Sequence, residues 1–378
     1  MRERGAVVEN SAAVGRDHRI DLFRGLSLWL IFIDHIPEVY LNRITPKNFG
    51  FSDAAEILVF LSGVASGMVY TPIVRQSGLR IALQRAIKRG FEIYFAQLCT
   101  TALLLLIASL LAIWQPDLLH HANVAVFFAD PFEALWQAVT MRYSPVNLDP
   151  LLLMITLHFA LVLVLPGILR YPAATLMASA LLYVTSHLLD WYIPAYPAGQ
   201  VYFNPMNWQF LYVIGVWWGA KPAHAALHYL DLKLWMLLAV GYVAFSFFIA
   251  LGWQFHSLEA YVPAPIFRLI YPIDKGHMDI LRLLHFFALA FVIKKGLPAD
   301  IPDRWQHYLR PVLWCGEHPL AVYCASVLLS FAGHAVLRMA WNNFLTQALV
   351  TLGGIVIMTG IAAKLAHLNQ SRGSPAPI

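Results

Sequence analysis

Long apolar runs separated by short polar connections make up most of the chain. A run of about 20 predominantly apolar residues is long enough for a helix to cross the hydrocarbon core of a bilayer. At this length the pattern predicts about ten transmembrane helices. They are expected at residues 20–40, 52–73, 90–113, 148–169, 172–190, 207–220, 234–252, 279–296, 311–334 and 343–367. The pattern therefore predicts an all-α polytopic integral membrane protein.

The remaining segments divide the chain further. Residues 114–147 are too polar to cross a membrane, and within them residues 131–142 (PFEALWQAVTMR) have the pattern of an amphipathic helix lying at the interface. We expect a polar cytoplasmic N-terminus over residues 1–19, a single transmembrane domain over 20–368 and a cytoplasmic tail over 369–378. No signal-peptide pattern precedes the first apolar run.

Composition agrees with this class of protein. Apolar residues make up 59% of the chain and charged residues 12%, whereas a soluble domain carries about 25% charged residues. The net charge is +5, but the basic residues are spread between apolar runs instead of clustering on one face, which argues against a nucleic-acid partner. The three cysteines lie inside apolar segments, and the histidines lack metal-ligand spacing, so we expect no disulfide framework and no metal site.

The distribution of basic residues predicts the orientation. If the N-terminus is cytoplasmic, most of the 26 Lys and Arg residues lie in segments on the same side. Positively charged residues are enriched in cytoplasmic segments of membrane proteins. An even number of spans would then place both termini in the cytoplasm.

The first span carries ionisable groups, which cost about 2.5–3.5 kcal/mol each at the centre of a membrane helix. Arg24 and His35 are separated by about three helical turns, or roughly 16 Å, and share a face. Histidine is the side chain best suited to proton transfer near neutral pH, so His35 is a candidate base. Asp34 or Glu38 could orient it, although Asp34 points about 100° away on an ideal helix. The alternative is a hydrogen-bond network between helices.

The second span combines polar and small residues. Glu56 lies deep enough that we expect it to face a cavity. Ser62, Gly63, Ser66 and Gly67 form a small-residue stripe, which predicts close helix packing. A nucleophilic Ser62 is the less favoured interpretation, because no base lies near it in the sequence.

Basic residues gather at the cytoplasmic end of the third span. Arg85 and Arg89 are four residues apart on one helical face, with Lys88 beside them. They are candidates for binding the phosphate groups of a ligand. Ordinary positive-inside topology accounts for them equally well.

Two further groups of residues are candidates for substrate binding. Arg282 and His285 lie three residues apart in the eighth span, where Arg282 either pairs with Asp279 or grips a carboxylate or saccharide. Asn204 and Trp208 stand at the outer start of the sixth span. A tryptophan there is typical of the aromatic belt, although an aromatic face beside amides also suits a sugar ring.

The spacing from Arg24 to His35 resembles the R-x10-H signature of the acyltransferase 3 superfamily, and more closely its OpgC-type branch, the succinyltransferases of osmoregulated periplasmic glucans. The pieces that carry this resemblance follow the chain in order. They are DLFRGLSLWLIFIDHIP (21–37), NFGFSDAAEILVFLSG (48–63), YSPVNLDPLLL (143–153), YFNPMNWQFL (202–211), DKGHMDILRLLHFFALA (274–290) and GEHPLAVY (316–323).

The resemblance implies an O-acyltransferase of the bacterial inner membrane. It implies acyl-coenzyme A, with succinyl-coenzyme A as the expected donor, no permanently bound cofactor, and a periplasmic glucan as the acceptor. His35, Asp34 and Arg24 would be catalytic. Arg85, Arg89, Glu56, Trp208, Asn204, Arg282 and His285 would bind substrate. A transporter or channel with an intramembrane polar path, or an acyltransferase for another acyl group or polysaccharide, remains the alternative.

Overall fold

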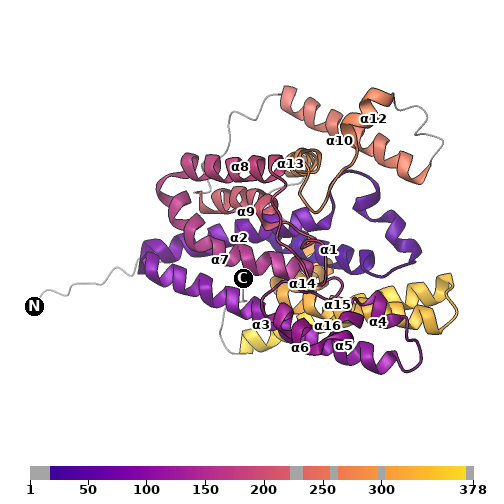
Figure 1. Cartoon of the computed structure of the whole chain (residues 1–378). Coiled ribbons are helices and arrows are strands. Elements are labelled where there is room, and N and C mark those ends of the chain that lie inside the picture. The colour runs from indigo at the N-terminus through magenta and orange to yellow at the C-terminus, as the bar shows by residue number, and fades with distance from the viewer. Residues whose placement is uncertain (1–17, 222–232, 256–262, 297–302, 372–378) are drawn as a thin grey trace, which may run out of the picture.

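The apolar runs fold into helices in the computed structural model, which describes residues 18–221, 233–255, 263–296 and 303–371 (Figure 1). Most of the expected N-terminal segment 1–19 and of the expected tail 369–378 therefore lies outside the described residues. The longer helices are α1 (His18–Asp34), α2 (Ala54–Ser77), α3 (Leu79–Leu111), α7 (Asp149–Arg170), α8 (Pro172–Leu188), α9 (Pro205–Ala220), α10 (Lys233–Gln254), α13 (Ile280–Gly296), α14 (Asp303–Glu317), α15 (Pro319–Met339) and α16 (Phe344–Ser371). The shorter ones are η1 (Tyr40–Ile44), η2 (Pro46–Asn48), α4 (Leu118–His121), α5 (Ala125–Ala129), α6 (Pro131–Val139) and α12 (Ala264–Ile270).

Six of the described helices, namely α2, α3, α7, α10, α15 and α16, are long and apolar enough to cross a membrane. Helices α1, α8 and α13 have 17 residues each and α9 has 16, so they lie just below that length. The prediction of a helical membrane protein is confirmed. The number of about ten spans and the side of the termini stay predictions.

Two predicted spans have the wrong limits. The span at 311–334 crosses a break, because α14 ends at Glu317 and α15 begins at Pro319. Proline lacks the N–H that would continue the hydrogen bonding of a helix and is well suited to the first position of a new one. The first span ends at Asp34 instead of residue 40. Pro37 disfavours helical backbone at the residue before it, and Glu38 has a positive φ of 64°.

The small-residue stripe on α2 packs directly against α9, as predicted. A Cβ atom at Gly63 or Gly67 would collide with the carbonyl oxygen of Tyr212 or Val216 on α9. In the reverse direction, a Cβ at Gly219 would collide with the carbonyl oxygen of Val64 on α2. The two backbones therefore touch along this contact, which fixes α9 against α2.

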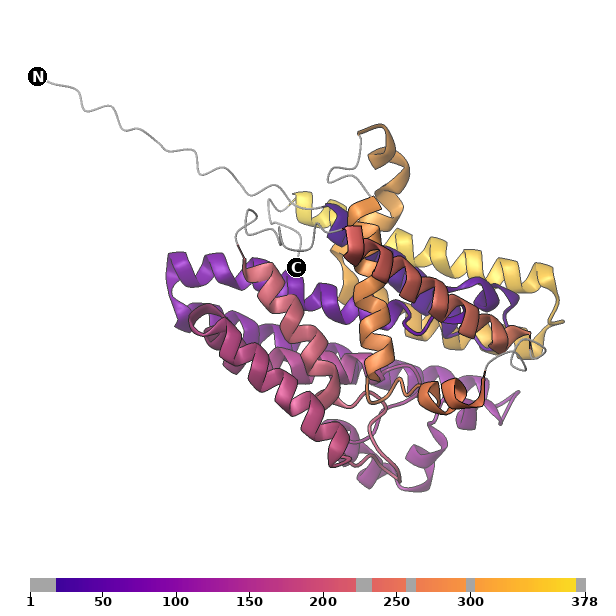
Figure 2. The ribbon, with the colours of Figure 1, turned by 90° about the horizontal axis from the view of Figure 1, so that it is seen from above.

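The other helices surround this pair. Helix α1 packs against α2, α14 and α15, α7 against α3 and α9, and α8 against α9, while α10 packs against α13. Figure 1 shows α10 and α12 at one edge of the bundle and α3 to α6 at another, and Figure 2 shows the long helices from above. Helix α6 is amphipathic as predicted, with Phe132 and Trp136 exposed and Ala134 buried. Its position at a membrane interface stays a prediction.

Candidate functional site

Two cavities adjoin one another inside the bundle. The larger, which we name the His35 cavity, has a volume of about 300 Å³. The smaller, the Arg24 cavity, has a volume of about 80 Å³. Leu58, Pro150 and Met154 border both cavities, so α2 and α7 form the wall between them.

His35 follows the last residue of α1, and its backbone N–H donates to Ile31 O at 3.0 Å. Its ring lies edge-on to Tyr323, with 6.5 Å between the ring centroids. Its buried Nδ1 atom has no hydrogen-bond partner among the described residues. The imidazole thus borders the cavity with a nitrogen that no described protein group occupies, as a base for a bound ligand requires.

The two carboxylates expected to assist His35 contact other groups. Asp34 Oδ1 accepts a hydrogen bond from Thr45 Oγ1 at 2.7 Å and lies 3.3 Å from Lys47 Nζ. Glu38 is exposed, and its carboxylate accepts from Asn342 Nδ2 at 3.5 Å. Among the described residues, no hydrogen bond joins His35 to either carboxylate. The helix ends at Asp34, and the turns that follow direct the side chains of Asp34 and Glu38 to other partners.

Asp149 is the acidic residue that sequence reasoning missed. It is the first residue of α7, and it lines the His35 cavity. Its carboxylate accepts from its own backbone N–H, and no hydrogen bond or ion pair joins it to another described residue. The segment YSPVNLDPLLL contributed to the resemblance. An aspartate before a proline at the start of an apolar run also suits a helix N-terminus, so the sequence alone did not mark Asp149 as a site residue.

Arg282 lies in a buried ionic cluster with Asp53, Glu56 and Lys275. Its Nε donates to Glu56 Oε1 at 2.8 Å, and its NH2 lies 3.2 Å from Asp53 Oδ2. Lys275 Nζ lies 2.6 Å from the same Asp53 oxygen. Asp279, the partner considered from the sequence, instead accepts from the N–H of Leu281 at 2.7 Å.

The ionic cluster corrects the interpretation of Glu56. This side chain is fully buried and borders neither cavity. Its second oxygen accepts from the N–H of Asp53 at 2.8 Å and completes a capping box with Asp53 at the start of α2. Glu56 and Arg282 therefore join α2 to α13, and the charged group of each is paired with other protein groups.

Lys275 extends from the connection between α12 and α13 to the His35 cavity. Burial lowers the pKa of Lys275, but the carboxylates of Asp53 and Glu56 outweigh burial and hold its pKa above the ordinary lysine value. The lysine is therefore charged at neutral pH, and Asp53 neutralises it.

His285 also has a protein partner. The N–H of Ser52 donates to its Nδ1 at 3.1 Å, so this nitrogen carries no proton and Ser52 Oγ donates to it as well, at 2.7 Å. The ring packs against Gly50, where a Cβ atom would overlap it. His285 borders neither cavity and fixes the turn before α2, and its contact with substrate stays a prediction.

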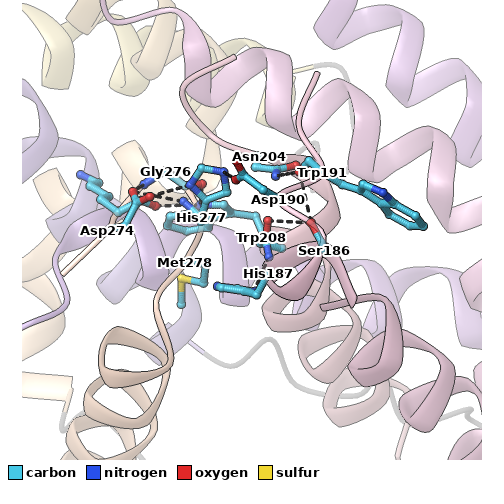
Figure 3. Close-up of polar contacts among 12 residues, drawn as sticks. Ser186, His187, Asp190, Trp191, Asn204, Trp208, Asp274, Gly276, His277 and Met278 are labelled. Carbon is cyan, nitrogen blue, oxygen red and sulfur yellow. Dashed lines mark hydrogen bonds and ion pairs between the residues drawn. The ribbon is translucent and has the colours of Figure 1, made fainter. Parts of the chain in front are cut away.

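The segment from Asp274 to Met278 is attached to α8 and α9 (Figure 3). Trp208 is fully buried, and its Nε1 donates to Lys275 O and Gly276 O, both at 3.0 Å. Asn204 caps α9 by accepting from Met206 N at 3.1 Å, and its N–H donates to Gly276 O at 2.9 Å. The ring of Trp208 is therefore covered by protein and borders neither cavity. Both residues instead hold the segment that carries Lys275.

The Arg24 cavity contains two guanidinium groups. Arg24 from α1 and Arg89 from α3 both line it, together with Ser62, His158 and Tyr323. Arg89 also pairs with Glu92 at 2.9 Å. Arg85 is exposed and does not border the cavity, so the structure separates the two arginines that share a helical face in the sequence.

His158 lines the same cavity and is 8% exposed. Its Nδ1 lies 2.8 Å from Met154 O. Because a carbonyl oxygen can only accept, Nδ1 carries the proton and Nε2 of the neutral ring is left with a lone pair. In the sequence His158 is only a lone polar residue within an apolar run, so nothing there marks it as a candidate.

The fold and the cavities define a helical membrane protein in which polar groups line two adjoining internal spaces. A family model described as OpgC protein matches residues 16–370, and the chain belongs to this family. Membership implies a glucan-modifying acyltransferase. Comparisons with curated proteins and with solved structures gave no match.

Proposed function

We propose that this protein is an O-acyltransferase of the bacterial inner membrane. It transfers an acyl group, with succinyl as the first candidate, from cytoplasmic acyl-coenzyme A to a hydroxyl group of a periplasmic glucan. The observation that carries the proposal is the pair of adjoining cavities, one lined by two guanidinium groups and the other by an imidazole. Transfer between separate substrates needs such neighbouring sites.

The donor occupies the Arg24 cavity in this proposal. A volume of about 80 Å³ suits one anionic group, such as a carboxylate or a phosphate, and not a whole coenzyme. Guanidinium groups bind both of these anions through paired charge-assisted hydrogen bonds. Arg24 and Arg89 would thus position the donor, and its thioester would lie toward the wall shared with the His35 cavity.

The acceptor occupies the His35 cavity. The imidazole of His35 takes the proton from a sugar hydroxyl as its oxygen attacks the thioester carbonyl carbon. A carbon–oxygen ester bond forms, the carbon–sulfur bond breaks, and the coenzyme A thiolate leaves. A thiol has an ordinary pKa of about 8.5, so it is a better leaving group than an alkoxide.

The test uses full-length protein purified in detergent. Succinyl-coenzyme A and acetyl-coenzyme A are each supplied with a glucan, free thiol is followed optically, and the glycan is weighed by mass spectrometry. We expect acceptor-dependent thiol release and a mass increase of one acyl group. If thiol release does not depend on the glucan and the glycan mass does not change, the proposal is wrong.

A transporter is the alternative, and the adjoining cavities lined by charged residues are the observation in its favour. A transporter would move a labelled glucan or acyl donor into sealed proteoliposomes without releasing thiol. Transfer chemistry without such uptake favours the acyltransferase.

A further inference from the structure

We propose that Tyr202 and Asp149 form a binding subsite for a neutral saccharide at the His35 cavity. The inference rests on the proposed function only in that a hydroxyl of the bound sugar is the acyl acceptor. It names the groups that hold the acceptor, which the family assignment does not.

Tyr202 is the aromatic residue placed to contact a ligand at this cavity. It lines the His35 cavity and is nevertheless 52% exposed, so it lies where the cavity meets the surface. The flat face of an aromatic ring carries partial negative charge, which attracts the C–H groups on the apolar face of a sugar ring. Trp208 was the candidate for this contact from the sequence, but Trp208 is buried and Tyr202 is not.

The backbone around Tyr202 is fixed in position. Val201 N donates to Ile193 O at 2.9 Å, and Asn204 N donates to Gly276 O at 2.9 Å. The ring lies edge-on to Phe203 at 4.9 Å between centroids, and Phe203 lies edge-on to Trp208 at 5.0 Å. A ring held this way loses little conformational freedom when a ligand stacks on it.

Asp149 supplies the hydrogen-bond acceptor. The carboxylate of Asp149 is partly exposed and lines the cavity, and apart from its own backbone N–H no described group donates to it. An ionised carboxylate can only accept hydrogen bonds. Sugar hydroxyls are the donors that such a group can hold, and His35 lines the same cavity.

The charges that face the cavity favour a neutral ligand. Lys47 is paired with Asp34 at 3.3 Å and Lys275 with Asp53 at 2.6 Å, so both cations are neutralised by protein groups. Asp149 then contributes an uncompensated negative charge. An anionic saccharide would be repelled, whereas a neutral one rich in hydroxyl groups would not.

The size of the cavity sets how much of a glucan it holds. Its volume of about 300 Å³ lies at the lower end of the range of roughly 300–1,000 Å³ for small-molecule sites. The cavity therefore suits a short part of an oligosaccharide, and Tyr202 can support the part that extends to the surface.

The experiment measures binding without any donor. Unlabelled neutral glucose oligosaccharides of different linkage are titrated into purified full-length protein, and their contact is followed by saturation-transfer difference NMR. Tyr202→Ala should weaken binding of the best oligosaccharide about tenfold, equivalent to roughly 1.4 kcal/mol, whereas Tyr202→Phe should retain it. Tyr192→Ala is the matched control, because Tyr192 is 51% exposed and does not line the cavity.

Asp149→Asn tests the carboxylate, and Asp190→Asn, at an exposed aspartate outside the cavity, is its control. We expect about tenfold weaker binding for Asp149→Asn alone, because the neutral amide oxygen is a weaker acceptor than a carboxylate and the NH2 group cannot accept from a sugar hydroxyl. If Asp149→Asn does not fold, the comparison of Tyr202→Ala with Tyr192→Ala decides the matter.

Unchanged binding in Tyr202→Ala would overturn the subsite, as would tighter binding of an acidic oligosaccharide than of its neutral counterpart. Because no donor is present, these outcomes are independent of acyl transfer. Wild-type protein that binds the oligosaccharide but transfers no acyl group would contradict the proposed function and leave the subsite standing. Wild-type protein that binds none of the oligosaccharides would overturn the subsite.

Discussion

At the scale of single residues, the partner of each buried polar group separates structural roles from ligand-binding ones. Arg282, Glu56 and His285 all find protein partners within the bundle. His35 and Asp149 instead border a cavity, where His35 Nδ1 has no partner among the described residues and no other described residue donates to the Asp149 carboxylate. An unsatisfied buried group is costly, so such positions persist where a ligand supplies the missing partner.

His35→Ala should lower the rate of acyl transfer by about 10²–10⁴, the usual effect of losing a general base. His35→Gln should have a similar effect, because an amide keeps a hydrogen-bonding group but cannot accept the proton. The rate is measured at matched protein concentration, with the melting temperature recorded alongside. His120→Ala, at an exposed histidine outside both cavities, is the control and should be neutral. A folded His35→Gln variant that keeps more than about a tenth of the rate would remove His35 from the mechanism.

Arg89→Gln should raise the KM for acyl-coenzyme A at least about tenfold, because a lost charge-assisted hydrogen bond costs roughly 1.5–3 kcal/mol. Arg85→Gln is the matched control, four residues away on α3 and exposed outside the cavity. Initial rates across a range of donor concentrations separate the two. Equal effects in both variants would mean that the arginines act through general surface charge.

The sequence identified several of these residues by type but not by partner. His35, Arg24 and Arg89 were singled out from the sequence and do line the two cavities; an ionisable group inside a membrane helix is costly, which draws attention to His35 and Arg24. The pairing of Glu56 with Arg282 joins residues 226 positions apart, and no helical spacing reveals such a contact. The burial of Trp208 likewise depends on where the segment 274–278 folds back over α9.

At the scale of helices, close backbone contact between α2 and α9 holds the wall of the Arg24 cavity. Gly219→Ala should destabilise the protein by about 1–3 kcal/mol, the usual cost of overpacking, because its Cβ would collide with Val64 O. Gly241→Ala on α10 is the control, since a Cβ there meets no atom within 4 Å. It should be neutral or stabilising by up to about 1 kcal/mol, because alanine favours helix. Thermal unfolding in one detergent measures both, and equal melting temperatures would contradict the close contact.

The stability of the segment that carries Lys275 should depend on pH, and the pKa of Asp274 gives the direction of that dependence. Burial raises the pKa of Asp274, but hydrogen bonds from the His277 side chain and from the N–H groups of His277 and Gly276 outweigh it and hold the pKa below the ordinary value. The resulting stabilisation is full above the unfolded pKa of about 3.9 and is lost as pH falls through the folded pKa. Asp274 is largely exposed, so solvent screening limits the effect to at most about 1 kcal/mol.

Asp274→Asn should therefore lower the melting temperature slightly at pH 7, and the difference from wild type should shrink as the pH falls below about 4. Thermal unfolding over a pH series measures it. Asp190→Asn, whose carboxylate is 81% exposed, should show no such trend. A difference that widens at low pH would contradict the assigned sign.

The helices themselves were largely predictable, because apolar length alone marks a membrane helix. The ends of the helices were harder to predict. The sequence contained Pro37 and Pro319 as signals for the ends of helices, but an apolar run continues past each of them and hides the break. The short turns η1 and η2, which bring Thr45 and Lys47 to Asp34, have no periodicity that a length-based analysis detects.

At the scale of the whole molecule, several connections between helices meet at the His35 cavity. The His35 cavity is lined by Lys47, Val146, Tyr202 and Lys275, which come from four separate connections between helices. Positive-inside reasoning assigns all four connections to the periplasmic side. The fold brings the ends of distant segments together on one side, as access for a large external acceptor would need.

The last prediction concerns this sidedness. In a variant whose three cysteines (Cys99, Cys315 and Cys324) are replaced, single cysteines are introduced at exposed Gln76, before the turn from α2 to α3, and at exposed Ala198, between α8 and α9. A membrane-impermeant thiol reagent should label Ala198→Cys in right-side-out vesicles and Gln76→Cys in inverted vesicles, because the basic residues at the start of α3 favour the cytoplasm. Labelling after detergent solubilisation controls for reactivity at both positions. If both cysteines react from one side of sealed vesicles, the chain does not cross the membrane as proposed, and the His35 and Arg24 cavities cannot serve opposite compartments.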